Sequence, residues 1–227
     1  MLGDAALFEG TMTLPSGRWT CLLGPSGVGK STVLRLILGL ETGGAFQGEI
    51  TAEDGGAVAE RVSYMAQSDL LMPWLSVMDN VTIGAKLRGE TPDTARAEAL
   101  LKRVGLSAHI TKKPAALSGG MRQRAALART LMEDRPVVLL DEPFSALDAS
   151  TRADMQELAA EVLKGKTVLL VTHDPAEAAR LGHQILLMSP SGMAHWPTPD
   201  SPAIRALDDP KVLACQTALM AHLRAAA

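Results

Sequence analysis

The stretch Gly24–Thr32, GPSGVGKST, decides how this chain folds. Its three glycines give the loop little to pack, and each glycine costs backbone entropy on folding. The apolar run Trp19–Leu23 before the loop predicts a buried strand. After it, apolar residues recur at the spacing of one helix face, namely Val33, Leu36, Ile37 and Leu40. The loop therefore joins a strand to a helix, which we expect to end at Gly43 and Gly44.

The same stretch matches the pattern G-x-x-x-x-G-K-[ST], whose backbone N–H groups cradle phosphates. Without bulky side chains the amides can approach an anion closely, and the helix that follows adds its positive end. Lys30 can reach the outer phosphates, and the Ser31 hydroxyl can ligate Mg²⁺. A chance glycine turn is the alternative, which the flanking strand and helix disfavour. The candidate nucleotide-binding residues of this loop are Gly24, Pro25, Ser26, Gly27, Val28, Gly29, Lys30, Ser31 and Thr32.

Composition limits the class of protein. The chain has 227 residues, of which 47% are apolar, enough for one large domain with a substantial core. Its net charge of −3 argues against a dedicated nucleic-acid binder. Cys21 lies in an apolar run, which predicts a buried free thiol and a reducing compartment. Asp4 and Glu9 interrupt any signal peptide, and the sequence predicts no membrane-spanning helix.

Further apolar runs predict strands at 137–140, 167–172 and 185–188, with helical patterns between them. Such alternation favours a mostly parallel sheet covered on both faces. Glycines and short β-prone runs over 45–66 predict hairpin-like strands, an N-terminal antiparallel portion. We therefore predict an α/β fold with a phosphate-loop core and an inserted helical subdomain.

The predicted organisation is one domain. Its nucleotide-binding core comprises residues 1–67 and 133–190, interrupted by the helical insertion at 68–132. A proline-rich tail at 191–227 ends in a helix that begins near residue 211. Within the chain, Thr91–Asp93 predicts a helix start, and Asp174 with Glu177 has the form of a capping box.

Two adjacent acids follow the strand in VVLLDEP, Val137–Pro143. Asp141 is placed to hold a metal through its water shell, and Glu142 can polarise an attacking water. A solvated strand end is the alternative for these acids.

A second candidate anion site lies in LSGGMRQR, Leu117–Arg124. Ser118 has the character of an N-cap, and Gly119 and Gly120 expose the first amides of a helix. Spacing alone favours an ordinary capped helix whose arginines face water.

Together these motifs, in this order, resemble the nucleotide-binding subunits of ATP-binding cassette (ABC) transporters from about residue 7 to residue 190. Asp148 then lies in a loop similar to the one that follows the acidic motif, as a further nucleotide contact. His173 resembles the switch histidine, which touches the γ-phosphate and orients the attack. Gln67 resembles the glutamine that senses metal and water.

The resemblance implies an ATPase that uses ATP and Mg²⁺, with Glu142 as the base and Ser31, Gln67 and Asp141 around the metal. Two copies, most simply of this same chain, pair head to tail. Ser118, Gly119 and Gly120 of one copy then face the γ-phosphate held by Lys30 of the other. Further implied partners are a membrane permease and, indirectly, a solute-binding protein. The resemblance also implies a cytoplasmic subunit on the inner face of the cell membrane, without a nucleic-acid partner.

The segment 68–80, SDLLMPWLSVMDN, resembles the region that receives a permease helix in importers of the family. Its apolar residues Leu70, Leu71, Met72 and Trp74 supply that landing surface or fill the core of the helical subdomain. The sequence LMPWLSV resembles that of the family branch whose members handle nitrate, sulfonates, taurine and pyrimidine vitamin precursors.

Other readings are a soluble ABC ATPase without a transport role, an exporter subunit and a small-molecule kinase. One feature departs from the family, whose members usually carry an upstream aromatic residue that stacks on adenine. Phe8 lies only sixteen residues before Gly24 and aligns with a later strand. Either the natural chain begins upstream of Met1, or another residue or none stacks on the base.

Overall fold

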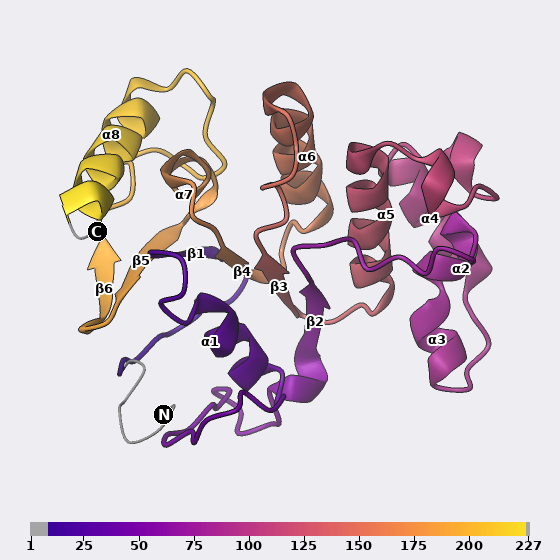
Figure 1. Cartoon of the computed structure of the whole chain (residues 1–227), viewed down its shortest axis with the longest axis horizontal. Helices are drawn as coiled ribbons and strands as arrows, with labels where there is room; N and C mark the ends of the chain where they lie inside the picture. Colours follow the sequence, from indigo (N-terminus) through magenta and orange to yellow (C-terminus); the bar gives the residue numbers. More distant parts are fainter. Residues whose placement is uncertain (1–8, 226–227) are drawn as a thin grey trace. The chain divides into compact units, whose positions relative to one another are not determined.

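The computed structural model describes residues 9–225, which form two compact units (Figure 1). Unit 1 combines the segments 1–62 and 165–227, and unit 2 comprises 63–164. The expectation that concerns Phe8 lies outside the described residues. The one-domain organisation with an insertion at 68–132 stays a prediction.

Unit 1 is built on four neighbouring strands. The central strand β1 (Trp19–Leu23) is buried along its whole length and runs parallel to β4 (Thr167–Val171) and β5 (Gln184–Ser189). β6 (Gly192–Trp196) pairs antiparallel with β5. Figure 1 shows α1 (Lys30–Ile37) on one side of these strands, with α7 (Pro175–Leu181) and α8 (Pro210–Ala225) on the other. The prediction of an α/β fold with a mostly parallel sheet is confirmed.

The antiparallel pairing lies elsewhere than expected. The only strand in the segment 45–66 is β2 (Val62–Met65), which follows a 3₁₀ turn at Ala59–Arg61. The antiparallel pair is β5–β6, in which Ser189 lies opposite Gly192 across a two-residue turn. Because prolines flank this hairpin, sequence reasoning assigned residues 191–196 to the proline-rich tail and missed β6.

α1 ends earlier than its apolar spacing predicts. Gly39 takes a left-handed φ of 69°, and its N–H bonds to the Leu36 carbonyl at 3.0 Å. The N–H of Leu40 returns to the Arg35 carbonyl at 2.9 Å, which closes the helix. Leu40 is consequently exposed, and Leu34 takes its expected place in the core. The expectation that Gly43 and Gly44 end the helix was wrong.

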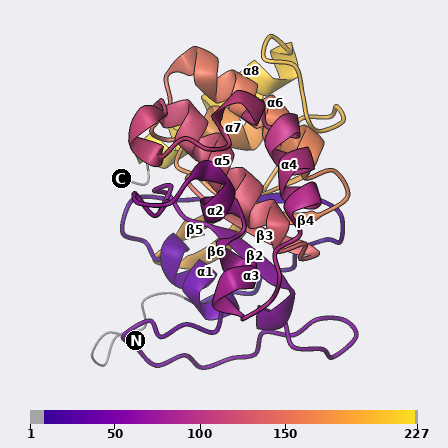
Figure 2. The same cartoon turned by 90° about the vertical axis from the view of Figure 1, so that its right-hand side faces the viewer.

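Unit 2 is mostly helical. Its helices are α2 (Val77–Val81), α3 (Ile83–Leu87), α4 (Thr94–Arg103), α5 (Gly119–Met132) and α6 (Ala149–Val162). Strand β3 (Val137–Asp141) and 3₁₀ turns at Ser107–His109 and Pro114–Ala116 complete it. α5 packs against α2, α3, α4 and α6, and Figure 2 shows α2, α4 and α5 side by side. Small buried residues along α5, Ala125, Ala126 and Ala128, permit that close packing.

Local sequence signals explain most helix starts. Asp93 caps α4 by accepting a hydrogen bond from the Arg96 N–H at 2.9 Å.

The buried Cys21 is a free thiol, as predicted, and burial raises its pKa. Of the helices that the structure describes, none combines the length and the apolar character that crossing a membrane requires.

Candidate functional site

The phosphate loop lies in unit 1, between the end of β1 and the start of α1. Gly29 is the N-cap of α1 with a left-handed φ of 111°, and no side chain caps the helix. By contrast, α5 and α6 start at Ser118 and Asp148, whose side chains accept first-turn N–H groups. The N-cap of α1 is thus a glycine without a capping side chain, and the positive end of the helix faces the loop, which suits a bound anion.

Lys30 and Gly24 shape the base of this loop. The Lys30 Nζ donates to the Gly24 carbonyl at 2.8 Å and the Pro25 carbonyl at 3.0 Å. A side chain at position 24 would collide with the Met188 carbonyl of β5, so only glycine fits there. The ammonium group is thus held over the loop, from which it can reach a phosphate.

His173 also lies in unit 1, two residues after the end of β4, and is exposed. Asp174 caps α7 by accepting the Ala176 N–H at 2.8 Å. Glu177 does not complete the predicted capping box. Its carboxylate instead accepts the buried Thr172 hydroxyl at 2.6 Å, because Thr172 lies within reach at the end of β4.

In unit 2 the two adjacent acids each have a side-chain partner. The buried Asp141 accepts a hydrogen bond from the Tyr64 hydroxyl at 3.1 Å. Glu142 has a left-handed φ of 46°, uncommon for a residue with a side chain, and accepts the Gln67 amide at 3.1 Å. The Ser145 hydroxyl bonds to the Glu142 carbonyl at 2.9 Å and holds this backbone in place.

The structure thus brings Gln67 to the pair Asp141 and Glu142, and Glu142 lies 75 positions further along the chain. Sequence reasoning missed Tyr64, which orients the Asp141 carboxylate. The available signal was weak: a tyrosine at an exposed position of β2, three residues before Gln67.

The signature segment forms the start of α5. The Ser118 hydroxyl accepts the Met121 N–H at 3.3 Å, and Gly119 and Gly120 make the first turn. A Cβ at position 120 would lie 2.6 Å from the Thr151 methyl group of α6, so close helix packing requires glycine there. The Ser118 hydroxyl keeps its own proton, which it can donate to an anion.

Asp148 has a local structural role. Its carboxylate accepts the Thr151 hydroxyl at 2.7 Å and the Thr151 N–H at 3.1 Å. Both bonds favour the ionised form and lower the pKa of Asp148. Capping of α6 therefore accounts for Asp148 by itself, while its contact with nucleotide stays a prediction.

The segment after Gln67 divides between the two roles that its sequence allows. Leu70 and Trp74 are exposed at 57% and 66%, whereas Leu71 is buried at 8%. The Arg129 guanidinium on α5 donates to the Asp69 carbonyl at 2.6 Å and to the Leu70 carbonyl at 2.8 Å. Arg122 of the same helix donates to the Asp69 carboxylate at 2.9 Å. An exposed apolar tip is thus fastened to the helix that carries Ser118.

Within residues 9–225, no group of three or more His, Cys, Asp or Glu side chains is placed to hold a metal ion by itself. The predicted donors Ser31, Gln67 and Asp141 offer one hydroxyl, one amide and one carboxylate oxygen. This donor set fits Mg²⁺, which keeps several waters and takes few protein ligands beside substrate phosphates.

Comparisons with known proteins identify relatives that bind ATP, as this phosphate loop predicts. A family model described as ABC transporter matches residues 7–145. An ABC transporter ATP-binding protein of Haemophilus influenzae is 50% identical over 185 residues, 80% of this chain and 75% of the relative. An aliphatic sulfonates import ATP-binding protein of Rhodococcus jostii is 47% identical over 184 residues, 80% of this chain and 72% of the relative. A taurine import ATP-binding protein of Yersinia pestis is 44% identical over 195 residues, 83% of this chain and 75% of the relative.

A solved ABC transporter in an inward-facing conformation is similar in structure. Its TM-score is 0.69 at 28% identity, over 81% of this chain and 73% of the solved chain.

Proposed function

This chain belongs to the ABC transporter family as an ATP-binding subunit and an ATPase, and we propose that it powers a solute importer as a Mg²⁺-dependent pair of identical copies. The observation that carries the proposal is the loop before α1, where the helix starts at a left-handed glycine without a side chain and the Lys30 ammonium group is held over the loop. A triphosphate supplies the negative charge that this arrangement stabilises.

Each site residue has a proposed task in hydrolysis. Lys30 and the loop amides bind the phosphates, and Glu142 accepts the proton of the attacking water. Gln67 holds the Glu142 carboxylate in one orientation, as their hydrogen bond supports. His173 donates to the γ-phosphate. Mg²⁺, when bound, neutralises phosphate charge beside Ser31, Gln67 and Asp141.

Pairing supplies the rest of the site. We propose that Ser118, Gly119 and Gly120 of one copy bind the γ-phosphate held by the other copy. The support is the start of α5, where the first two residues are glycines without side chains and the Ser118 hydroxyl, which accepts the Met121 N–H, keeps a proton to donate. ATP then joins the copies, and its cleavage lets them separate, because the shared charge is lost.

The exposed Leu70 and Trp74 form the proposed docking surface for a membrane permease. Two apolar side chains on a rigid loop suit contact with a short amphipathic helix. The permease would hold the subunit at the inner face of the membrane, and a solute-binding protein would deliver cargo to the permease. Nucleic acid has no role in this scheme.

Import of a small solute is the proposed direction of transport, with a sulfonate or taurine as the cargoes that the relatives favour. Relatives named for import of aliphatic sulfonates and taurine support it, at 47% and 44% identity. Nitrate and pyrimidine vitamin precursors are further cargoes of the branch that the segment 71–77 resembles. Uptake of labelled taurine and of an alkanesulfonate, in cells with the permease and either the parent chain or Glu142→Gln, separates these cargoes.

The test of pairing uses the Glu142→Gln variant, which retains ATP but cannot deprotonate water. With MgATP its mass in light scattering should be that of a dimer, and without ATP that of a monomer. Adding Ser118→Glu should abolish the dimer by charge repulsion, whereas the matched Ser107→Glu, at an exposed site in the same unit, should not. A monomer in MgATP, or an unaffected dimer with Ser118→Glu, would contradict the proposal.

A further inference from the structure

We propose that Arg205, in the C-terminal segment, is a positioning residue for His173 and acts through α7. This inference rests on the proposed role of His173 in hydrolysis. It gives the segment after Ser189 a task that the phosphate-loop chemistry does not provide.

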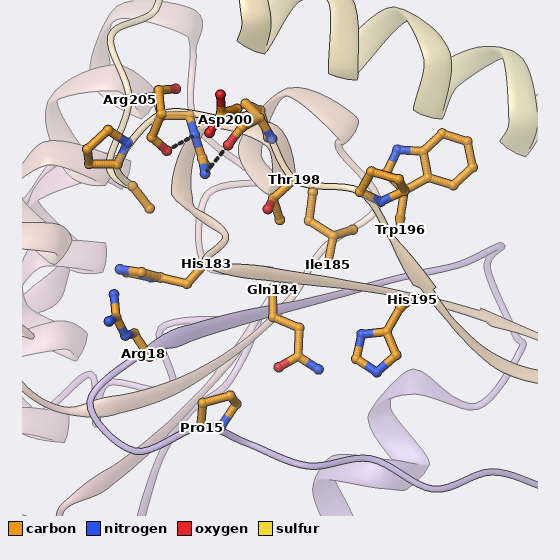
Figure 3. A pocket seen from close by; sticks show the side chains of 15 residues that line it. Pro15, Arg18, His183, Gln184, Ile185, His195, Trp196, Thr198, Asp200 and Arg205 are labelled. Carbon is orange, nitrogen blue, oxygen red and sulfur yellow. Dashed lines mark hydrogen bonds between the residues drawn. The ribbon is translucent and has the colours of Figure 1, made fainter.

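Arg205 is buried, with 5% of its surface exposed, and its guanidinium donates hydrogen bonds to four backbone carbonyls. It donates to Pro199 at 3.0 Å and to Ser201 at 3.0 Å, both in its own loop. Figure 3 shows Arg205 beside this loop, on the wall of an open cavity of about 950 Å³. The side chain therefore holds the loop in one shape.

The same guanidinium holds the end of α7. Its Nη1 donates to the Ala179 carbonyl at 2.9 Å and to the Gly182 carbonyl at 2.8 Å, where the helix runs out of partners of its own. Two more bonds join the same residues: the Arg205 backbone N–H donates to the Arg180 carbonyl, and the Arg180 side-chain Nε donates to the Arg205 carbonyl. A cation at a helix C-terminus is also favoured by the helix dipole.

At the other end of α7, the two residues that flank His173 are both hydrogen-bonded to the helix. Thr172, just before it, donates to Glu177 on α7 at 2.6 Å. Asp174, just after it, caps α7 and gives its own N–H to the Thr172 hydroxyl at 3.0 Å. The backbone of His173 is therefore tied to α7 through both neighbours, and a shift of this seven-residue helix moves the imidazole.

A Glu177 carboxylate on one turn and the Arg205 bonds on the last turn leave α7 little freedom to slide. Precise placement of the imidazole matters for the rate, because a displacement of about 1 Å at a reacting group costs on the order of 100-fold in turnover. Nucleotide affinity should respond far less, since the phosphate loop and Lys30 belong to other elements.

The experiment measures steady-state ATP hydrolysis and ATP affinity of the full chain for Arg205→Lys, His173→Ala and the double variant. Lysine keeps the charge but cannot reach four carbonyls from a planar fork. We expect Arg205→Lys to lower kcat about tenfold with KM for ATP within about twofold, and to have no further effect in the His173→Ala background. Arg224→Lys, in the exposed part of α8, is the matched control and should leave both constants unchanged.

A kcat equal to the parent's, or an equal loss in both backgrounds, would show that Arg205 serves stability alone. Should Arg205→Lys fail to fold, Thr172→Val tests the same link, and normal turnover there overturns the inference. If His173→Ala itself keeps the parent turnover, the proposed role of His173 is wrong and the inference falls with it. If only His173→Ala loses turnover, the inference alone fails.

Discussion

The side-chain amide of Gln67 donates a hydrogen bond of 3.1 Å to the carboxylate of Glu142, which lies 75 positions further along the chain. This bond ties the residue before the exposed apolar tip to the proposed base. The tip and the base thus belong to one hydrogen-bonded set, because Arg129 and Arg122 fasten the intervening segment to α5.

Replacing Gln67 by alanine should free the Glu142 carboxylate. We expect hydrolysis to fall about tenfold, since a lost orienting hydrogen bond is worth roughly 1 kcal/mol or more, with ATP affinity little changed. Phosphate release and an ATP titration measure the two effects, with Gln216→Ala on α8 as control. Equal losses of affinity and turnover would place Gln67 in nucleotide binding instead.

Removing the Tyr64 hydroxyl should weaken the metal site. Tyr64→Phe leaves the buried Asp141 carboxylate without its 3.1 Å donor, so this carboxylate is held less firmly. The Mg²⁺ concentration that gives half-maximal hydrolysis should rise about two- to tenfold, the equivalent of one neutral hydrogen bond. A Mg²⁺ titration at saturating ATP checks this, and an unchanged midpoint would exclude Tyr64 from the site.

Replacing Lys30 by alanine should weaken binding of the nucleotide itself. A charge-assisted bond to phosphate is worth about 1.5–3 kcal/mol, so ATP affinity should fall at least about tenfold. Isothermal titration without Mg²⁺ isolates this term. Lys102→Ala on α4 removes an exposed lysine as the control, and parent-like affinity in Lys30→Ala would argue against the phosphate-loop assignment.

Acid should destabilise unit 1 through His183. The Trp19 N–H donates to its Nδ1 at 3.1 Å, and burial, followed by Arg18 and Arg205, lowers its pKa from 6.5. The unfolded chain therefore takes up this proton first as pH falls, and stability is lost below about pH 6.5. His183→Asn should reduce the drop in melting temperature between about pH 7.5 and about pH 5.5. A drop as large as the parent's would mean that other groups carry it.

Local patterns predicted the three parallel strands of unit 1, but neither β6 nor the end of α1. The apolar run at 19–23 forms β1 with the predicted bounds, because a buried strand between glycine-rich turns leaves one register. The two-residue turn before β6 escaped prediction, since prolines at 190 and 197 outweighed the short apolar run between them. The end of α1 at Gly39, whose φ is left-handed, also escaped prediction. The sequence offers several glycines after the helix, and spacing alone does not say which of them ends it.

The candidate site was predicted in its residue types more than in its contacts. Motifs identified Asp141 and Glu142 as acids after a strand, but only the fold brings Tyr64 and Gln67 to them. The buried anchor Arg205 carried no signal, because a single arginine in a proline-rich segment reads as a solvated residue. Partners that depend on packing between distant segments cannot be read from spacing.

The way in which α5 holds the exposed tip has an evolutionary consequence. Arg129 binds the carbonyl of Leu70, and every amino acid at position 70 provides a carbonyl. The attachment therefore survives any substitution that accepts the left-handed φ of 48° there. Descendants of this chain can redesign the outward-facing side chain to suit a new membrane partner, while the linkage behind it and the chemistry of cleavage are inherited intact.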